Sequence, residues 1–215
     1  MPVESEVTMK KITCRCDAVI EIDAPDSIDL DADAAIVSRL ATGDSPSAMC
    51  PRCGAIVRAE LPLRVTAKSC GLDLVILPEM ERLSAYRGKA DPAGTSEILL
   101  GYQELFERTR MVRDELDARA VEMLKYALQG KAEDAEPDAE ITVFYNGMKD
   151  GSLEFHILGL KSGQAGVVRL PRASYDKVVA DLPGSIAREP YKTIFSGRYR
   201  SIKKLGFLSS TSEAG

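Results

Sequence analysis

The residues best suited to chemistry in this sequence are cysteines, and four of the five stand in two close pairs. The first pair lies in Lys-Ile-Thr-Cys-Arg-Cys-Asp at residues 11–17, and the second in Met-Cys-Pro-Arg-Cys-Gly at residues 49–54. Two short-spaced pairs separated by a longer segment can surround one zinc ion with four thiolates. The sequence therefore predicts a zinc centre with four ligands, namely Cys14, Cys16, Cys50 and Cys53.

The second pair has the residues of a tight metal-binding turn. Pro51 pre-sets the turn, and Gly54 can adopt a positive φ that points backbone N–H groups at the sulfur atoms. Four thiolates on Zn²⁺ leave a residual charge of about −2, which nearby cations stabilise. The sequence supplies such cations beside both pairs, as Lys10, Lys11, Arg15 and Arg52.

The first pair is one residue shorter, and no glycine follows Cys16. In a regular strand Cys14 and Cys16 would point to the same face, so joint chelation requires the chain to turn there. Asp17 and Cys70 are alternative ligands. Two other interpretations stay open: a site that has lost its metal and keeps its cysteines in the core, and a redox motif at residues 50–53. No helix N-terminus follows to lower a thiol pKa, which disfavours the redox interpretation.

The cysteine motifs resemble those of a known family. Ile-Thr-Cys-Arg-Cys, Cys-Pro-Arg-Cys-Gly, Leu-Pro-Leu at residues 61–63 and a strand ending in Leu-Pro are similar to the CpXC domain, a bacterial and archaeal family named for two Cys-Pro-X-Cys motifs. The similarity continues into residues 101–105 and 115–125, and so covers roughly the first 130 residues. The resemblance implies a zinc-ribbon-like domain and no established activity. The first motif departs from the family pattern by one missing residue.

Composition indicates an ordinary folded protein. A length of 215 residues, with 45% hydrophobic residues and a net charge of −5, allows one large domain or two small ones. The acidic residues 1–7 do not read as a secretory signal, and apolar runs such as residues 74–77 are too short to span a bilayer. We therefore expect a cytoplasmic protein whose odd number of cysteines serves as thiols or metal ligands rather than as structural disulfides.

The segments around the cysteines alternate between apolar and polar residues. Residues 9–13 and 17–23 are predicted as strands, and residues 31–43 as a short helix with acidic residues at its start and glycine at its end. Residues 55–66 and 72–77 are predicted to complete an antiparallel sheet.

The middle of the chain has helical periodicity. After a predicted loop at residues 81–94, an apolar stripe runs from Ile98 and Leu99 to Leu128, with Gly130 as a stop signal. The stripe fits one long helix, or two helices of which the second is capped by Asp114 or Asp117. The charged residues 131–138 are predicted to form a linker.

The C-terminal part alternates again. Residues 141–145 and 153–157, joined by a turn that contains Asn146-Gly147, predict a β-hairpin, and residues 166–170 predict a third strand before a helix that ends at residues 183–184. His156, the single histidine, is interpreted as a solvent-facing or cross-strand residue. No nucleophile, phosphate-binding glycine loop or paired-carboxylate motif accompanies it, so we predict no enzymatic activity.

A basic segment at residues 188–204 combines cations with aromatic residues, which is the composition of a nucleic-acid surface. The pI of about 5.1 argues against that use. The segment could instead neutralise the acidic residues 23–44, within the chain or across a dimer.

Together these patterns predict an α+β protein with three parts. These are a β-rich zinc-ribbon-like domain at residues 1–83, a helical region and linker at residues 84–135, and a small C-terminal α/β module at residues 136–215. The predicted function is a non-enzymatic interaction module in which zinc is purely structural and the partner is a protein, with no membrane contact. Nucleic-acid binding through residues 188–204 and thiol oxidoreduction by Cys50 and Cys53 are the alternatives.

Overall fold

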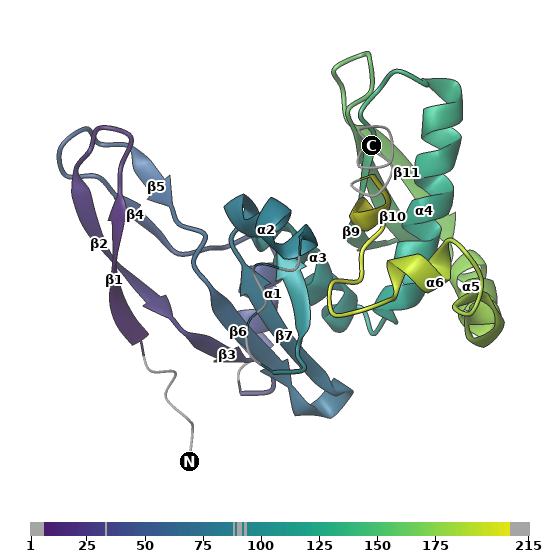
Figure 1. Cartoon of the computed structure of the whole chain (residues 1–215), viewed down its shortest axis with the longest axis horizontal. Helices are drawn as coiled ribbons and strands as arrows, with labels where there is room; N and C mark the ends of the chain where they lie inside the picture. The colour runs from purple at the N-terminus through teal and green to yellow at the C-terminus, as the bar shows by residue number, and fades with distance from the viewer. Residues whose placement is uncertain (1–6, 33, 88, 90–91, 93, 207–215) are drawn as a thin grey trace. The chain divides into compact units, whose positions relative to one another are not determined.

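The computed structural model describes residues 7–32, 34–87, 89, 92 and 94–206, and it mixes helices with strands along the chain (Figure 1). The protein is therefore α+β, as predicted. The chain divides into two units, Met1–Phe106 and Glu107–Gly215, which are described one at a time. Within the described part, no helix is long and apolar enough to cross a membrane.

Two β-hairpins of the first unit carry four of the five cysteines. Strands β1 (Val7–Thr13) and β2 (Val19–Pro25) pair antiparallel, and so do β4 (Ser47–Met49) and β5 (Ile56–Arg58). The alternation of β2 places Ile20, Ile22 and Ala24 in the interior, because successive side chains of a strand point to opposite faces. The predicted strands on either side of the first cysteine pair are confirmed.

A separate four-stranded sheet completes the first unit. Its order is β3 (Ser27–Asp29), β6 (Leu63–Ala67), β7 (Leu72–Leu77) and β8 (Glu97–Leu100). Only β6 and β7 pair antiparallel, through a tight connection that contains the 3₁₀ turn η1 (Lys68–Cys70); β3 pairs with β6, and β7 with β8, in parallel. The predicted antiparallel pairing of residues 55–66 with residues 72–77 is confirmed by β6 and β7, although residues 55–66 contain two strands, β5 and β6, and the sequence does not predict β3 or β8. Long connections precede β6 and β8, which leaves these strands free to pair in parallel.

Helix α1 (Ala34–Ala41) confirms the helix predicted at residues 31–43. Two local predictions are wrong here. The predicted loop at residues 81–94 contains α2 (Arg82–Tyr86), which follows the 3₁₀ turn η2 (Glu79–Glu81); residues 88, 90, 91 and 93 lie outside the described part. Ile98 and Leu99 belong to β8 rather than to a helix, because Gly101, with a φ of +79°, separates that strand from α3 (Tyr102–Arg113).

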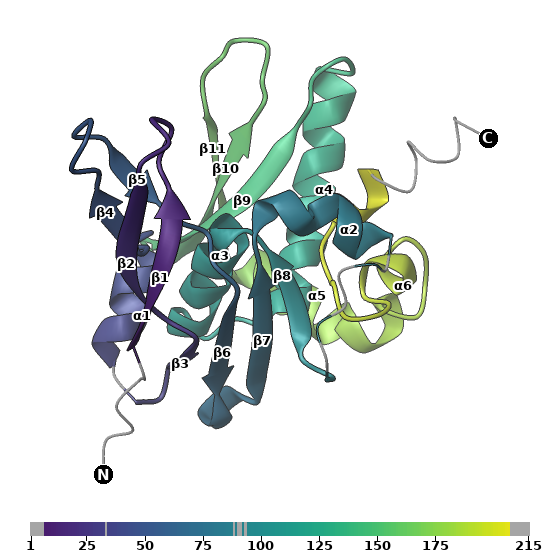
Figure 2. The ribbon, with the colours of Figure 1, turned by 60° about the vertical axis from the view of Figure 1, so that its left-hand side comes forward.

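The second unit is built on a three-stranded antiparallel sheet with α4 (Ala118–Ala135) packed beside it (Figure 2). The strands are β9 (Thr142–Lys149), β10 (Ser152–Leu158) and β11 (Gly166–Pro171), in the order β11-β10-β9. The predicted hairpin and third strand are confirmed. The turn predicted from Asn146-Gly147 is wrong, because these residues continue β9 and the chain turns at Asp150 and Gly151, whose φ angles are +49° and +73°. Tyr145, Phe155 and Val121 lie among the buried residues that join the sheet to the helix.

The structure resolves the alternatives for the helical region. The stripe forms two helices rather than one, and Asp117 caps the second, since its side chain accepts a hydrogen bond of 2.8 Å from the N–H of Arg119. The stop predicted at Gly130 is wrong, and so is the first part of the linker predicted at residues 131–138, because α4 continues to Ala135; residues 136–138 lie outside the helix. Leu128 and Ala132 both pack into the core there, which offsets the cost of about 1 kcal/mol for a helical glycine.

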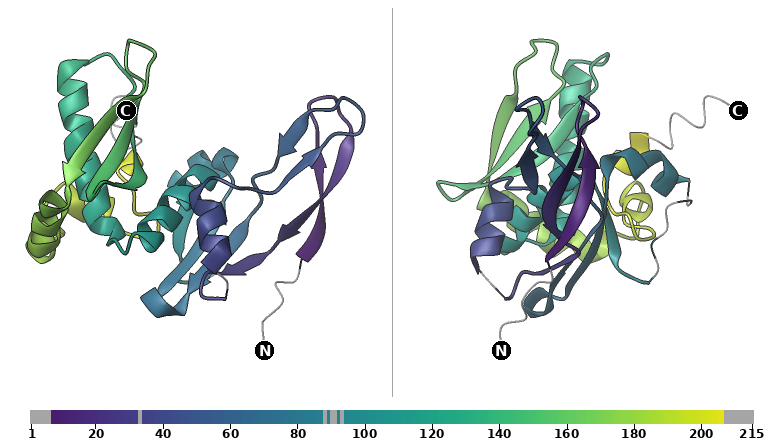
Figure 3. Two further views of the ribbon diagram at one scale, coloured as in Figure 1. Left: turned by 180° about the vertical axis from the view of Figure 1, so that it is seen from behind. Right: turned by 90° about the vertical axis from the view of Figure 1, so that its left-hand side faces the viewer.

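A buried ion-pair network lies inside the second unit. Lys125, with an exposed fraction of 1%, donates from Nζ to Glu107 at 2.9 Å and to Glu122 at 2.6 Å. The same carboxylates accept backbone N–H groups from Tyr145 and Ile202. The network therefore links α3, α4, β9 and the segment that follows α6 (Tyr191–Ile194). Helix α5 (Arg172–Ser185) packs against α4 (Figure 3).

Candidate metal centre

The two cysteine pairs lie in the loops at the ends of the two hairpins, and all views place these loops side by side (Figures 1–3). We call residues 14–18, between β1 and β2, the first cysteine turn, and residues 50–55, between β4 and β5, the second cysteine turn. Strands β2 and β4 contact each other, which sets the two turns next to one another.

The four sulfur atoms converge. All four Sγ atoms lie within 4.8 Å of one another, and the Cys14–Cys53 and Cys16–Cys50 distances are both 3.6 Å. Tetrahedral coordination with Zn–S bonds of about 2.3 Å separates the sulfur atoms by about 3.8 Å. A disulfide would need about 2.05 Å, and the cysteines are free thiols. The group therefore has the spacing of a four-coordinate metal site.

Both turns close in the same way despite their different lengths. The N–H of Cys14 donates to the carbonyl of Ala18 at 2.9 Å, and the N–H of Cys50 donates to the carbonyl of Ala55 at 2.8 Å. Each turn also contains one residue of left-handed conformation: Asp17 has a φ of +63° and Gly54 a φ of +71°. These two residues donate their N–H groups to the carbonyls of Cys14 and Cys50, each at 2.9 Å.

Asp17 thus takes the place that Gly54 takes in the longer turn. Aspartate is among the few residues that adopt this conformation at modest cost, because its short polar side chain tolerates it. The chain does turn between Cys14 and Cys16, as joint chelation requires, although no glycine follows the pair. The sequence suggests Asp17 as an alternative ligand and as the first residue of a strand; the strand begins instead at Val19, and the tolerance of aspartate for positive φ is the signal for its place in the turn.

The thiols differ in their electrostatic environment. The backbone N–H of Cys53, assisted by that of Arg52, lowers the pKa of Cys50 to about 6, against burial that opposes the shift. The N–H of Ala55 acts in the same sense on Cys53, but the neighbouring thiols and burial outweigh it and raise its pKa to about 12. One thiolate is therefore favoured before any metal binds, and its charge opposes ionisation of Cys53.

The cluster is partly anchored in the core. Cys14 and Cys50 are buried together with Ile20, whereas Cys16 is half-buried and Cys53 is exposed. Partly buried Ile12 and Val57 pack against this group. The fixed sulfur atoms thus come from one cysteine of each turn, and the second cysteine of each turn faces a more open environment.

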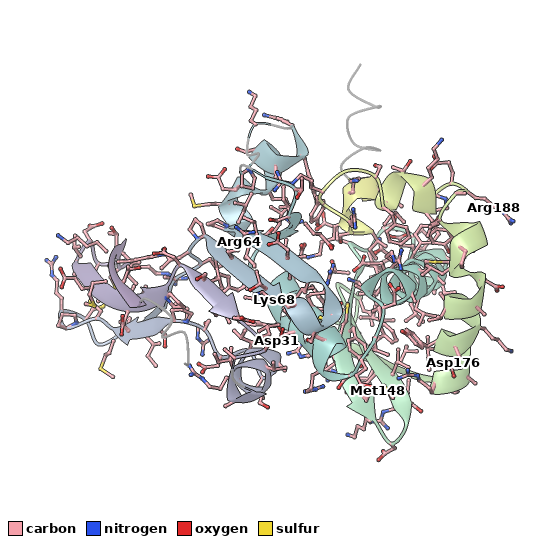
Figure 4. The ribbon with its side chains drawn as sticks, turned by 90° about the horizontal axis from the view of Figure 1, so that it is seen from below. Asp31, Arg64, Lys68, Met148, Asp176 and Arg188 are labelled. Carbon is pink, nitrogen blue, oxygen red and sulfur yellow. The ribbon has the colours of Figure 1, made fainter. Side chains whose placement is uncertain are left out.

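The other residues considered as ligands lie outside the group. Cys70 ends η1 and is exposed, and its Sγ contacts the carbonyl of Ala67 at 3.8 Å. Asp31 accepts a hydrogen bond of 2.9 Å from the backbone N–H of Ser69, the residue before Cys70, and so holds η1 in place. Figure 4 labels Asp31 and Lys68, the first residue of η1. Neither Asp17 nor Cys70 belongs to the four-residue group that the described residues form.

His156 fits its interpretation as a cross-strand residue. It stands opposite Phe144 in the sheet, and its Nε2 lies 3.3 Å from Glu154. Glu154 also accepts from Arg169 at 2.9 Å and from Asn146 at 2.9 Å, and these bonds lower its pKa to about 2.

Several residues of the basic segment contact other residues of the second unit. The Nζ atom of Lys204 donates to the carbonyls of Thr193 and Ser196 at 3.1 and 2.6 Å, and Lys203 lies 5.0 Å from the ring centre of Phe144. Tyr191 meets the ring of Tyr126 edge-on at 5.7 Å. These cations and aromatic rings are engaged within the chain.

The profile of the CpXC protein family matches residues 12–125, just over half of the chain, and spans both cysteine turns. This chain belongs to the CpXC family. An uncharacterised protein of Treponema pallidum (strain Nichols) is similar to it, with 27% identity over 92% of this chain and 98% of that protein. No solved structure matches. Among CpXC members this chain carries a first motif in the form Cys-Arg-Cys, and the geometry described above shows how the shorter motif still joins the cluster.

Proposed function

We propose that this CpXC protein is a non-enzymatic interaction module in which Cys14, Cys16, Cys50 and Cys53 hold one structural zinc ion. The observation that carries the proposal is the convergence of four sulfur atoms within 4.8 Å. Four soft thiolates suit Zn²⁺ among the abundant divalent metals, and the hairpins would form the two halves of a zinc ribbon. A site with four protein ligands leaves no position for substrate or for an activated water molecule.

The metal would link two hairpins that are small by themselves. A two-stranded hairpin is marginally stable in water, and the core around the cysteines is limited to a few residues. Binding energy of the metal would supply what this core lacks, as in other small zinc domains. The module would then present a folded surface to another protein.

The pairing of Cys50 with Cys53 does not require a redox function. A lowered thiol pKa at Cys50 is a property that redox motifs share. A two-cysteine redox motif, however, needs no further thiols, whereas Cys14 and Cys16 complete a group of four here. A strand, β5, follows the second turn in place of a helix whose N-terminus would stabilise a thiolate.

Nucleic-acid binding through the basic segment, residues 188–204, is the less favoured function. The Nζ atom of Lys204 donates to carbonyls of the same segment, and Lys203 lies against the ring of Phe144, so these two ammonium groups are partly engaged within the second unit. A sequence-independent nucleic-acid surface would bind oligonucleotides with an affinity that falls steeply with salt, because counterions are released. We expect no such steep dependence for the full chain.

The test is the metal content of the full chain purified without added zinc, measured together with its free thiols. We expect one zinc ion per chain and one thiol, Cys70, that reacts without chelator. Cys53→Ser should abolish stoichiometric zinc, and Cys70→Ser serves as the matched control that retains it. Five reactive thiols without metal, or a Cys50–Cys53 disulfide, would overturn the proposal.

A further inference from the structure

Arg52 connects the two cysteine turns. Its Nη1 atom donates a hydrogen bond of 3.0 Å to the main-chain carbonyl oxygen of Cys16, which lies 36 residues away in the sequence. Arg52 stands inside the second turn, directly before Cys53. A single guanidinium group therefore ties the backbone of one ligand pair to the backbone of the other.

Within the first cysteine turn, the backbone hydrogen bonds leave the carbonyl of Cys16 to be held by Arg52. The internal hydrogen bonds of the turn use the carbonyls of Cys14 and Ala18, at 2.9 Å each, and the carbonyl of Cys16 takes no part in them. Cys14 is fixed in the core, whereas Cys16 is only half-buried. Cys16 packs only partly against the core of Cys14, Ile20 and Cys50, so the hydrogen bond at its carbonyl is an additional restraint on the second ligand of the shortened pair.

We propose that Arg52 is a positioning residue of the metal centre, whose hydrogen bond holds Cys16 at its distance of 3.6 Å from Cys50. The inference rests on the proposed function, and it adds a residue that is not itself a ligand. Groups that orient metal ligands through hydrogen bonds commonly change metal affinity by about 10–100-fold when they are removed. Because Arg52 is exposed, the lower end of this range applies.

Arg15 provides a matched control. It is also an exposed arginine between the cysteines of a turn, so it brings the same charge to the same centre. No side-chain hydrogen bond joins Arg15 to the second turn within the described residues. Comparison of the two arginines therefore separates the effect of the hydrogen bond from the general effect of a positive charge near four thiolates.

The experiment is titration of the metal-free full chain with Co²⁺, which reports tetrahedral thiolate coordination through its visible absorption. Arg52→Gln should raise the apparent Kd for Co²⁺ about tenfold and alter the absorption at saturation, since Cys16 loses its fixed position. Arg15→Gln should change the Kd by less than about threefold and leave the saturated spectrum unaltered. Far-UV circular dichroism of each variant verifies that the fold is retained.

Equal loss of affinity in both variants would overturn the proposal, because charge alone would then explain the effect. An unchanged Arg52→Gln variant would overturn it as well. Failure of the unaltered chain to bind Co²⁺ or Zn²⁺ would refute the proposed function, and with it the role of Arg52 toward a metal. The link between the turns is then judged separately in metal-free protein, where backbone hydrogen exchange at Asp17 should be faster in Arg52→Gln than in Arg15→Gln.

Discussion

At the scale of single residues, Asp17 is decisive for the first cysteine turn. Its φ of +63° is costly for most residues but mild for aspartate, and it allows the turn to close over the carbonyl of Cys14. The side chain itself is exposed and lies outside the group of four thiols. Asp17 therefore acts through its backbone conformation.

Substitution of Asp17 should test this conformational role. Asp17→Gly should stabilise the metal-loaded protein by about 0.5–1 kcal/mol, and Asp17→Val should destabilise it by about 1–2 kcal/mol, because a β-branched residue resists positive φ. Asp17→Asn is the control for charge, since asparagine tolerates the same conformation. Urea unfolding measures all three. A stabilising Asp17→Val would contradict the prediction.

A second residue-scale feature is the environment of Glu154 on β10. Arg169 and Asn146 hold its pKa at about 2, well below the ordinary 4.5. Because the folded pKa is the lower one, the interaction stabilises the fold above pH about 4.5 and is lost as the pH falls toward 2.

Arg169→Gln should therefore lower stability at neutral pH and flatten the loss of stability between pH 4.5 and 2, the window set by the two pKa values. Unfolding by urea at a series of pH values measures this, and NMR titration of the Glu154 carboxyl should show its pKa rising. Arg172→Gln removes an exposed cation that pairs with Asp176 within α5, and it should leave the pH profile unchanged. An equal change in both variants would contradict the role of Arg169 in lowering the pKa of Glu154.

At the scale of elements, the buried ion-pair network joins segments that are distant in sequence. Burial raises the pKa of Glu107, while the two carboxylates around Lys125 raise the pKa of that ammonium against the effect of burial. Glu122 also accepts a hydrogen bond from the backbone N–H of Ile202, which lies 80 residues further along the chain. The network therefore fixes the segment after α6 to α4.

Lys125→Met should destabilise the protein by about 3–5 kcal/mol, because it leaves two buried carboxylates without their cation. Arg39→Ala, which breaks the exposed pair between Arg39 and Asp44, should cost no more than about 1 kcal/mol. Urea unfolding with both variants measures the contrast. A similar small loss in both would mean that the network contributes little to stability.

Sequence patterns predicted elements best where period and turn signals agree. The alternation of residues 141–145 and 153–157 correctly predicts the β9–β10 hairpin, but the turn lies at Asp150-Gly151, since Asn146 and Gly147 continue β9. Ile98 and Leu99 were misassigned because a short buried strand that runs into a helix has no alternation to distinguish it. Gly130 predicts the end of a helix, but α4 continues through it because the packing of neighbouring residues outweighs the low helix propensity of glycine.

The same limits apply to the site. The four cysteines were identified from their spacing, since side-chain type and distance along the chain are enough to suggest a shared ion. The bond from Arg52 to Cys16 joins residues on two hairpins, and no local pattern encodes such a tertiary contact. Cys70 could not be set aside from the sequence, because its place in η1 depends on the β6–β7 connection.

At the scale of the whole molecule, all four clustered cysteines belong to the first of the two units, Met1–Phe106. The second unit has its own core around Tyr145 and Phe155. The proposed metal is thus expected to stabilise one unit directly.

Removal of metal by a chelator should accelerate backbone hydrogen exchange in β1, β2, β4 and β5, because the link between the hairpins is lost. Exchange in β9, β10 and β11 should change little, and these strands serve as the internal control. Mass spectrometry of peptides from the full chain measures both regions at once. Equal acceleration in the two sets of strands, or none in either, would contradict this prediction.

The closure of each cysteine turn by one cysteine N–H and one alanine carbonyl has a consequence for how such genes can change. The five-residue and six-residue loops differ by one codon, yet strand pairing starts at the same point beyond each closing bond. A deletion inside the loop therefore leaves the facing of every strand residue unaltered, whereas a deletion one position outside it would exchange the buried and exposed faces of a strand. A one-residue change in loop length can therefore be accommodated where both cysteines and the closing hydrogen bond are kept, whereas a one-residue change in strand length cannot.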